Sequence, residues 1–79
     1  MHLMPSEKRR PRGVVTAWYL ERGFGFVKSD DGKIVFVHYG AIRETIHKYL
    51  RQGEKVEFDL VQTERGSQAR DLRILPASE

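Results

Sequence analysis

Cysteine is absent from this 79-residue sequence, so no disulfide supports the fold and no thiolate is available for chemistry. This absence fits a reducing compartment. The sequence also has no apolar run near the roughly 18 residues of a membrane helix, and its N-terminus lacks the apolar block of a secretion signal. We therefore expect a soluble, cytoplasmic chain that forms one small domain, near the size at which a single core is just sufficient.

Signs of catalysis are missing as well. No serine stands in a recognisable nucleophile setting, and Asp30 and Asp31 precede a glycine, as acids in a turn do. The "GFG" triplet lies in a predicted strand, whereas a phosphate-binding loop precedes a helix. The histidines do not have the spacing of metal ligands; they are His2, His38 and His47. We expect no enzyme, no cofactor, no metal, no small-molecule substrate and no membrane contact.

The net charge of +3 is unevenly distributed. Residues 1–12 carry this excess, with two prolines and no periodicity, so we predict a disordered basic tail. Its charged residues are Glu7, Lys8, Arg9, Arg10 and Arg12. Beyond the tail, residues 22–51 are rich in bases and residues 52–79 are more acidic. One side of the folded part is therefore predicted to be basic, which suits nucleic acid.

Five segments have the alternation, or the β-branched and aromatic content, of strands. They are residues 13–20, 23–29, 33–39, 54–62 and 68–75. After the third segment, Ile42, Ile46 and Leu50 recur at a spacing of four, which predicts one or two helical turns. Five short strands with one helical piece predict an all-β, five-stranded antiparallel barrel over residues 13–76, with residues 77–79 as a short end.

Alternation within the strands assigns two faces. In the third segment, one side carries the valines and Tyr39, and the other carries Ile34, Phe36 and His38. Because a histidine is costly to bury without partners, we expect the valine side to face the core. The same alternation turns Val27 inward in the second segment. If these two segments pair, the outward side chains are Phe24, Phe26, Lys28, Phe36 and His38.

This outward set predicts a binding surface. Phenylalanines are usually buried, but a chain of this length has no second layer to cover the face, and exposed apolar patches of this kind mark interaction sites. Aromatic rings stack on unpaired bases, at about 1–3 kcal/mol per base, and neighbouring cations meet phosphates. The neighbouring cations are Arg22, Lys28 and Lys33. We therefore predict binding to single-stranded nucleic acid.

The sequence "GFGFV" followed by "VFVHY" resembles the cold-shock domain, and the match resumes at "LRQGEKVEF" and "RGSQA". The resemblance covers nearly the whole chain after the tail. It implies an OB-type barrel that binds single-stranded RNA and DNA. It implies base stacking by Phe24, Phe26, Phe36, His38 and Tyr39. It also implies phosphate or polar contacts from Arg22, Lys48 and Arg65.

Three positions depart from the family pattern. The usual Lys-Trp-Phe of the first strand is Thr16-Ala17-Trp18, the acidic residue before "VFVH" is replaced by Ile34, and the loop aromatic aligns with His47. The change at Ile34 removes an acceptor for a base edge. These departures predict weaker or differently tuned binding.

The side on which Trp18 lies follows from the parity of the first strand. If Val15 faces the core, Ala17 and Tyr19 share its side and Trp18 points outward. The opposite parity would bury the hydroxyl of Thr16 without an obvious partner. We therefore expect Trp18 to stack on bases with the other rings.

These inferences together predict a monomeric, non-catalytic module that binds single-stranded RNA or DNA. Its expected role is that of an RNA chaperone or a regulator of transcription or translation. The alternative is a protein-interaction barrel that uses the same aromatic surface to dock a partner chain.

Overall fold

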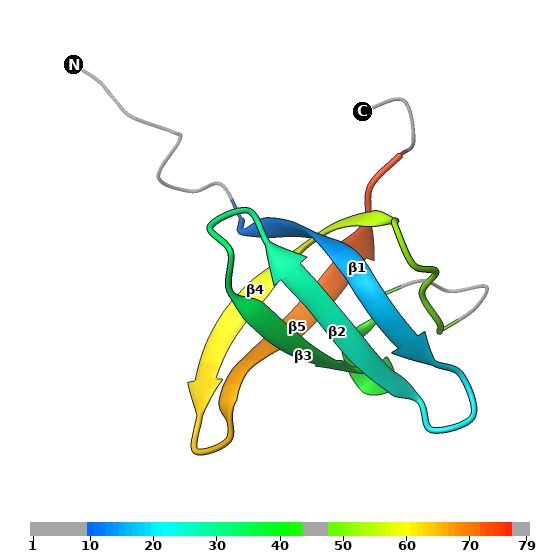
Figure 1. Cartoon of the computed structure of the whole chain (residues 1–79), viewed down its shortest axis with the longest axis horizontal. Helices are drawn as coiled ribbons and strands as arrows, with labels where there is room; N and C mark the ends of the chain where they lie inside the picture. Colours follow the sequence, from blue (N-terminus) through cyan, green and yellow to red (C-terminus); the bar gives the residue numbers. More distant parts are fainter. Residues whose placement is uncertain (1–9, 44–47, 77–79) are drawn as a thin grey trace.

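Five strands close into a barrel in the computed structural model, which describes residues 10–43 and 48–76 (Figure 1). The strands are β1 (Arg12–Tyr19), β2 (Phe24–Ser29), β3 (Ile34–His38), β4 (Lys55–Thr63) and β5 (Gly66–Ile74). Their order around the barrel is β1-β2-β3-β5-β4, and β4 also pairs with β1. Every neighbouring pair is antiparallel except β3 and β5, which run parallel. The predicted all-β, five-stranded barrel is confirmed, with one parallel contact in its closure.

The barrel begins earlier than the boundary predicted from the sequence. β1 starts at Arg12, and the amide of Phe58 in β4 donates a hydrogen bond of 3.0 Å to the carbonyl of Pro11. Arg10 donates to the carboxylate of Asp59 at 3.2 Å. Residues 10–12 therefore belong to the barrel rather than to a tail, because these contacts hold them against β4. Residues 1–9, which carry the rest of the predicted tail, and residues 77–79 lie outside the described residues.

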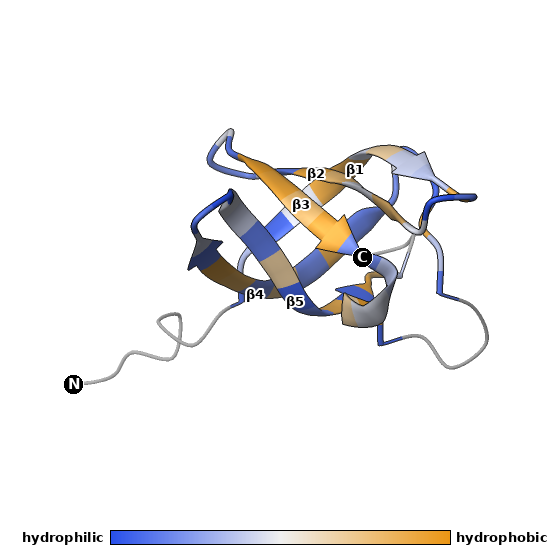
Figure 2. Ribbon diagram, turned by 90° about the horizontal axis from the view of Figure 1, so that it is seen from below, coloured by the Kyte–Doolittle hydropathy of each residue, from blue (hydrophilic) through white to orange (hydrophobic). Residues whose placement is uncertain are grey.

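The core lies between the inward faces of all five strands. Val15 of β1 and the valines of β2 and β3 are buried, as the alternation predicted, together with Val56 and Phe58 of β4. The largest buried side chains are Phe58, Ile42, Leu72, Val15, Val27, Val35, Val37 and Val56. The ribbon of β3 is hydrophobic over most of its length, whereas β5 is mostly hydrophilic (Figure 2). Burying one such side chain contributes about 1.5–3 kcal/mol, so these contacts supply the main stabilisation of the barrel.

Tyr39 departs from the alternation of the third segment. β3 ends at His38, and Tyr39 begins a short 3-10 turn, η2 (Tyr39–Ala41). The Tyr39 side chain is 48% exposed and does not continue the valine side into the core. The turn at the strand end breaks the period of two, which frees this ring from the inner face.

The helical turn that the structure describes lies before Ile42, whereas the spacing of Ile42, Ile46 and Leu50 predicted helical turns after it. Only η2 is helical in the described part of this connection, and Ile46 lies outside it. Ile42 forms an isolated parallel bridge with Leu72, and Leu50 is in irregular backbone, yet both are buried. Ile42 and Leu50 therefore fill the core from non-helical backbone at their own positions, which differs from the helical turns that their spacing predicted; residues 44–47 lie outside the described ranges.

A bulge in β1 changes the parity of its second half. Val15 pairs with Val27 and Ala17 pairs with Phe26, so Thr16 is an extra residue between the two pairs. The Thr16 hydroxyl is exposed and donates to the carbonyl of Phe26 at 3.2 Å. Residues directly opposite each other on antiparallel strands share a face. The side chains after Thr16 therefore lie on the face opposite to the one that regular alternation would give them.

Trp18 consequently lies on the inner side of the sheet, opposite Gly25, and packs against the core. Tyr19 lies on the outer side, opposite Phe24. The expectation that Trp18 points outward is therefore wrong, because it assumed regular alternation through Thr16.

Candidate nucleic-acid interface

The outer face of β1, β2 and β3 carries side chains in rows that the strand register places side by side. From the β1–β2 turn upward, the rows are Tyr19–Phe24–His38, then Ala17–Phe26–Phe36, then Val14–Lys28–Ile34. The first two rows hold five rings, and Tyr39 adds a sixth from the adjacent turn. We call these six rings the aromatic face: Tyr19, Phe24, Phe26, Phe36, His38 and Tyr39.

The three phenylalanines form the centre of the aromatic face. Ring centroids are 6.2 Å apart for Phe24 and Phe26, 5.6 Å for Phe24 and Phe36, and 5.9 Å for Phe26 and Phe36. These distances are typical of stabilising aromatic pairs. All three side chains are half-buried, so each is fixed by its neighbours while part of it faces solvent. The structure thus brings together the phenylalanines that the sequence predicted to share a face.

His38 and Tyr39 extend this cluster along one edge. Their ring centroids are 4.5 Å apart, and both side chains are exposed. The amide of Gly40 donates to Nδ1 of His38 at 3.1 Å, so the neutral imidazole carries its proton on Nε2. The amide of Tyr39 donates to the carbonyl of Gly23 at 2.9 Å. A side chain at Gly23, whose φ is +75°, would meet the Tyr39 ring at 2.7 Å, so glycine is needed for this ring to lie there.

Trp18 supports the face from beneath. Its indole Nε1 is buried and has no hydrogen-bond partner among the described residues. The missing side chain of Gly25 leaves room for the indole, since a Cβ there would lie 2.6 Å from Cε3 of Trp18. Gly25 therefore makes space on the inner side of β2, while its neighbours Phe24 and Phe26 lie on the outer side.

Tyr19 is the ring that the sequence analysis did not include among the binding residues. Its centroid lies 5.3 Å from that of Phe24, and its side chain is 46% exposed. The available signal was Gly25, because a glycine facing inward leaves space for a large inward neighbour such as Trp18. That neighbour then forces Tyr19 outward.

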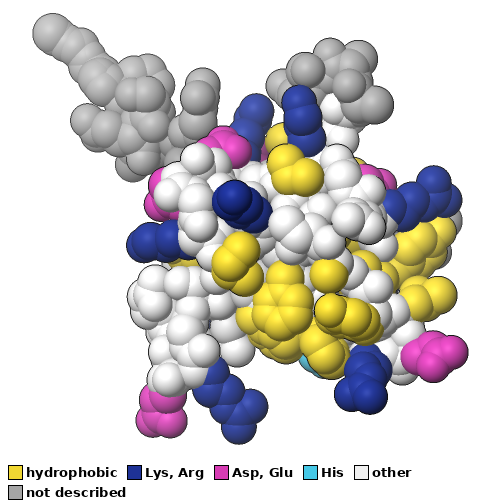
Figure 3. Space-filling view, in the orientation of Figure 1, with side chains coloured by type: hydrophobic (Ala, Val, Ile, Leu, Met, Phe, Trp, Pro, Cys, Tyr) yellow, Lys and Arg dark blue, Asp and Glu magenta, His cyan; other side chains and the backbone are white. Residues whose placement is uncertain are grey.

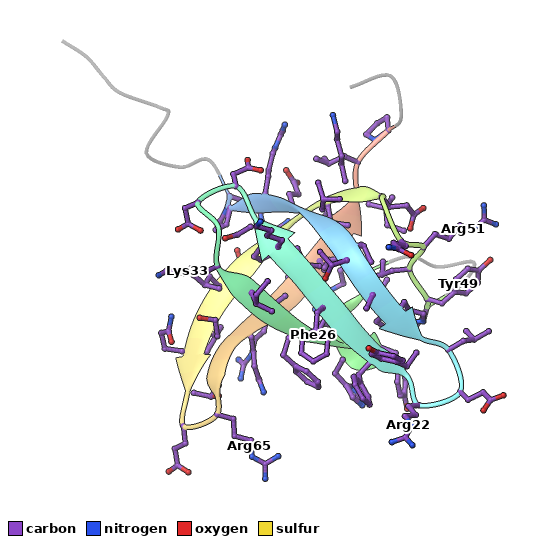
Figure 4. All side chains as sticks on the ribbon, in the orientation of Figure 1. Arg22, Phe26, Lys33, Tyr49, Arg51 and Arg65 are labelled. Atoms are coloured by element: carbon purple, nitrogen blue, oxygen red, sulfur yellow. The ribbon has the colours of Figure 1, made fainter. Side chains whose placement is uncertain are left out.

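Cations lie around the aromatic face. Figure 4 shows Arg22, Lys33 and Arg65 extending from three different turns around the central Phe26, and Figure 3 shows hydrophobic side chains gathered on this face with Lys and Arg at its margins. Lys28 lies on the same outer side of the sheet as the rings, in the row with Ile34. Arg22 and Lys28 are exposed and form no ion pair with another residue of the described ranges.

Two predicted site residues are less directly placed. Lys48 is exposed, and its ammonium donates to the carbonyl of Ile42 at 3.0 Å, which holds it beside the connection after η2. His47 lies outside the described residues. The structure therefore does not join either residue to the ring contacts described above.

The carboxylates of β4 and β5 are matched by arginines. Arg10 lies 3.5 Å from Glu57, 3.2 Å from Asp59 and 3.7 Å from Asp71. Arg43 lies 2.7 Å from Asp71. The hydrogen bond from Arg43 is the main cause that holds the pKa of Asp71 below its usual value; desolvation opposes it, and the nearby charge of Arg10 adds to it. These pairs neutralise acids on the β4–β5 side, so those carboxylates do not cancel the positive potential of the cations around the aromatic face.

Two classes of site are not found in the described residues. Within residues 10–43 and 48–76, no three His, Asp or Glu side chains are grouped so as to hold a metal ion. Over the same ranges, no helix has the length and apolar character needed to cross a membrane.

Comparisons with known proteins agree with this geometry. The family model described as the "'Cold-shock' DNA-binding domain" matches residues 11–75. A cold shock-like protein CspC of Bacillus cereus is 44% identical over 61 residues, which are 77% of this chain and 94% of that protein. A major cold shock protein of Streptococcus pyogenes is 41% identical over 64 residues, which are 81% of this chain and 96% of that protein.

A solved structure shares the fold. The Drosophila protein titled Unr CSD456 superposes with a TM-score of 0.74 over 98% of this chain and 33% of its own, at 23% identity. At this level of identity the likeness concerns the OB-type architecture alone.

Proposed function

Because the chain belongs to the cold-shock domain family, we propose that its aromatic face binds single-stranded RNA or DNA by stacking on unpaired bases. Cold-shock proteins are non-enzymatic nucleic-acid-binding proteins, and this chain is accordingly not an enzyme. We further propose that it acts as an RNA chaperone or as a regulator of transcription or translation, by holding strands unpaired.

The observation that carries this proposal is the cluster of Phe24, Phe26 and Phe36 on the outside of the barrel. Their centroids are 5.6–6.2 Å apart, and the rings fix one another, so little side-chain entropy is lost when a base stacks on them. Stacking contributes about 1–3 kcal/mol per base and accepts every base, because each base has a π-face.

Electrostatics contributes the second part of the interaction. The exposed Arg22 and Lys28 attract the phosphates of a strand that lies across the rings. The exposed Ile34 side chain offers no acceptor to a base edge, so the face is expected to discriminate weakly among base sequences. Binding should therefore be strongly dependent on salt and tolerant of sequence.

Titration of the protein with a short oligothymidylate, and with the RNA equivalent, tests the proposal. Phe26→Ala should weaken binding by about 1–3 kcal/mol, since it removes one stacking surface. Phe58→Leu is the matched control: Phe58 is fully buried, so this change should lower the free energy of unfolding without affecting the affinity of the folded protein.

Two results would contradict the proposal. One is an absence of binding by the unaltered chain at low salt, which favours a partner protein as the occupant of the face. The other is full affinity of folded Phe26→Ala protein for both oligonucleotides.

A further inference from the structure

Tyr19 owes its place on the aromatic face to the bulge at Thr16. Without the extra residue, Tyr19 would continue the inward parity of Val15. With it, Tyr19 pairs with Phe24 on the outer side, and the row runs on to His38. The ring lies 5.3 Å from Phe24, tilted by 51°, and its side chain remains 46% exposed. A ring that only covered Phe24 would not need to leave this much of its surface open.

The backbone of Tyr19 is held firmly where β1 ends. Its carbonyl accepts hydrogen bonds from the amides of Arg22, at 2.9 Å, and Gly23, at 2.8 Å. The carbonyl of Gly23 in turn accepts from the amide of Tyr39. The turn therefore ties Tyr19 to the far edge of the aromatic face. Since a tyrosine has only two side-chain torsions, a base that stacks on it costs little conformational entropy.

β1 contributes its ring to the aromatic face at Tyr19 and not at Ala17. Ala17, in the row of Phe26 and Phe36, carries a methyl group. The ring on β1 thus lies two residues further along, about 7 Å nearer to the β1–β2 turn. Arg22 extends from that same turn and is exposed, so a cation is available beside the ring (Figure 4).

From this arrangement we propose that Tyr19 stacks on one additional nucleobase, at the β1–β2 end of the aromatic face, and that Arg22 contacts the accompanying phosphate. The proposal rests on the proposed function and extends it: it lengthens the strand that the face holds by one nucleotide toward this turn. Tyr19 is then a binding residue, and Ala17 marks a gap in the surface between two stacking positions.

The experiment is a length series of oligothymidylates, from three to eight nucleotides, titrated against the unaltered chain and its variants. Tyr19→Ala should leave the affinity for the shortest ligands unchanged and weaken the longer ones about 5- to 150-fold, because only they reach the added position. Tyr19→Phe should behave like the unaltered chain, since it keeps the ring. Leu20→Ala is the matched control, because Leu20 is 69% exposed and is not part of the aromatic face; it should not change the length dependence.

A structural role for Tyr19 would give a different pattern. Tyr19→Leu keeps an apolar contact with Phe24 and removes the π-face, so it should lose the length-dependent gain as Tyr19→Ala does. If Tyr19→Leu and Tyr19→Ala retain full affinity at every length while Phe26→Ala is weakened, the added stacking position is refuted and the proposed function stands. If the unaltered chain binds none of the oligonucleotides, both are refuted.

Discussion

Replacing Gly25 with alanine tests how the aromatic face is supported. The new Cβ would meet the carbonyl oxygen of Ala17 and would lie 2.6 Å from Cε3 and 2.9 Å from Cα of Trp18. Two of these atoms belong to the backbone of β1 and cannot rotate away, so β1 and β2 must separate, and the indole must also shift. Overpacking of this kind costs about 1–3 kcal/mol. For a domain of this size, that corresponds to a fall in Tm of about 5–20 °C.

The same displacement should weaken oligonucleotide binding, because Phe24 and Phe26 flank Gly25 and move with it. Thermal unfolding followed by circular dichroism gives the change in Tm, and titration below the transition gives the affinity of folded protein. Gly40→Ala is the control for stability, since its Cβ would lie 3.3 Å from Nδ1 of His38, an exposed side chain that can rotate.

A double variant separates the two clashes made by the new Cβ. In a Trp18→Leu background the indole is gone, so Gly25→Ala should cost less than it does in the unaltered chain. If Gly25→Ala leaves Tm, Trp18 fluorescence and affinity unchanged, the close packing of the indole beneath β2 is refuted.

Three further predictions follow from the structure. Trp18 is the single tryptophan and packs against the core, so its emission should be blue-shifted in the free protein and should change little when a saturating oligonucleotide is added; solvent-like emission that is strongly quenched would contradict this placement. Removing residues 1–9, which include Lys8 and Arg9, should reduce the slope of log affinity against log salt by at most about two phosphate contacts and leave the order of base preference unchanged; loss of binding at low salt would make this segment the principal site. The pKa of Asp71 is lowered chiefly by the hydrogen bond from Arg43, so its contribution to stability is present above its ordinary pKa of 3.8 and is lost as the pH falls through the lower folded value. Asp71→Asn should therefore destabilise the protein to urea at neutral pH but much less in strong acid, and an equal loss at both would contradict the ion pair.

The grouping of Phe24, Phe26, Phe36 and His38 was predictable from the sequence, because side-chain alternation in a strand depends only on the local backbone. Chain length then indicated that nothing else in the barrel covers them. The four side chains do lie on one outer face, and the valines opposite them are buried. Their role in binding remains a prediction that the titrations address.

The parity of β1 was decided only in the folded barrel. Before Thr16 this strand pairs with both β2 and β4, and after it with β2 alone, so it must bend where the two pairings part. A bulge accommodates that bend. The bulge moves Trp18 inward and Tyr19 outward, and the residue pattern of β1 by itself does not show this shift.

Long-range contacts decided the remaining differences in the same way. Ile42 bridges Leu72 across the barrel and has extended backbone, whereas its spacing with Leu50 predicted a helical turn at this position. Arg10 contacts carboxylates on β4 and β5 that lie far along the sequence. It therefore belongs to the barrel and not to the predicted tail. Local periodicity specifies which side chains share a strand face, whereas bulges, bridges and ion pairs arise from strands that meet only when the barrel closes.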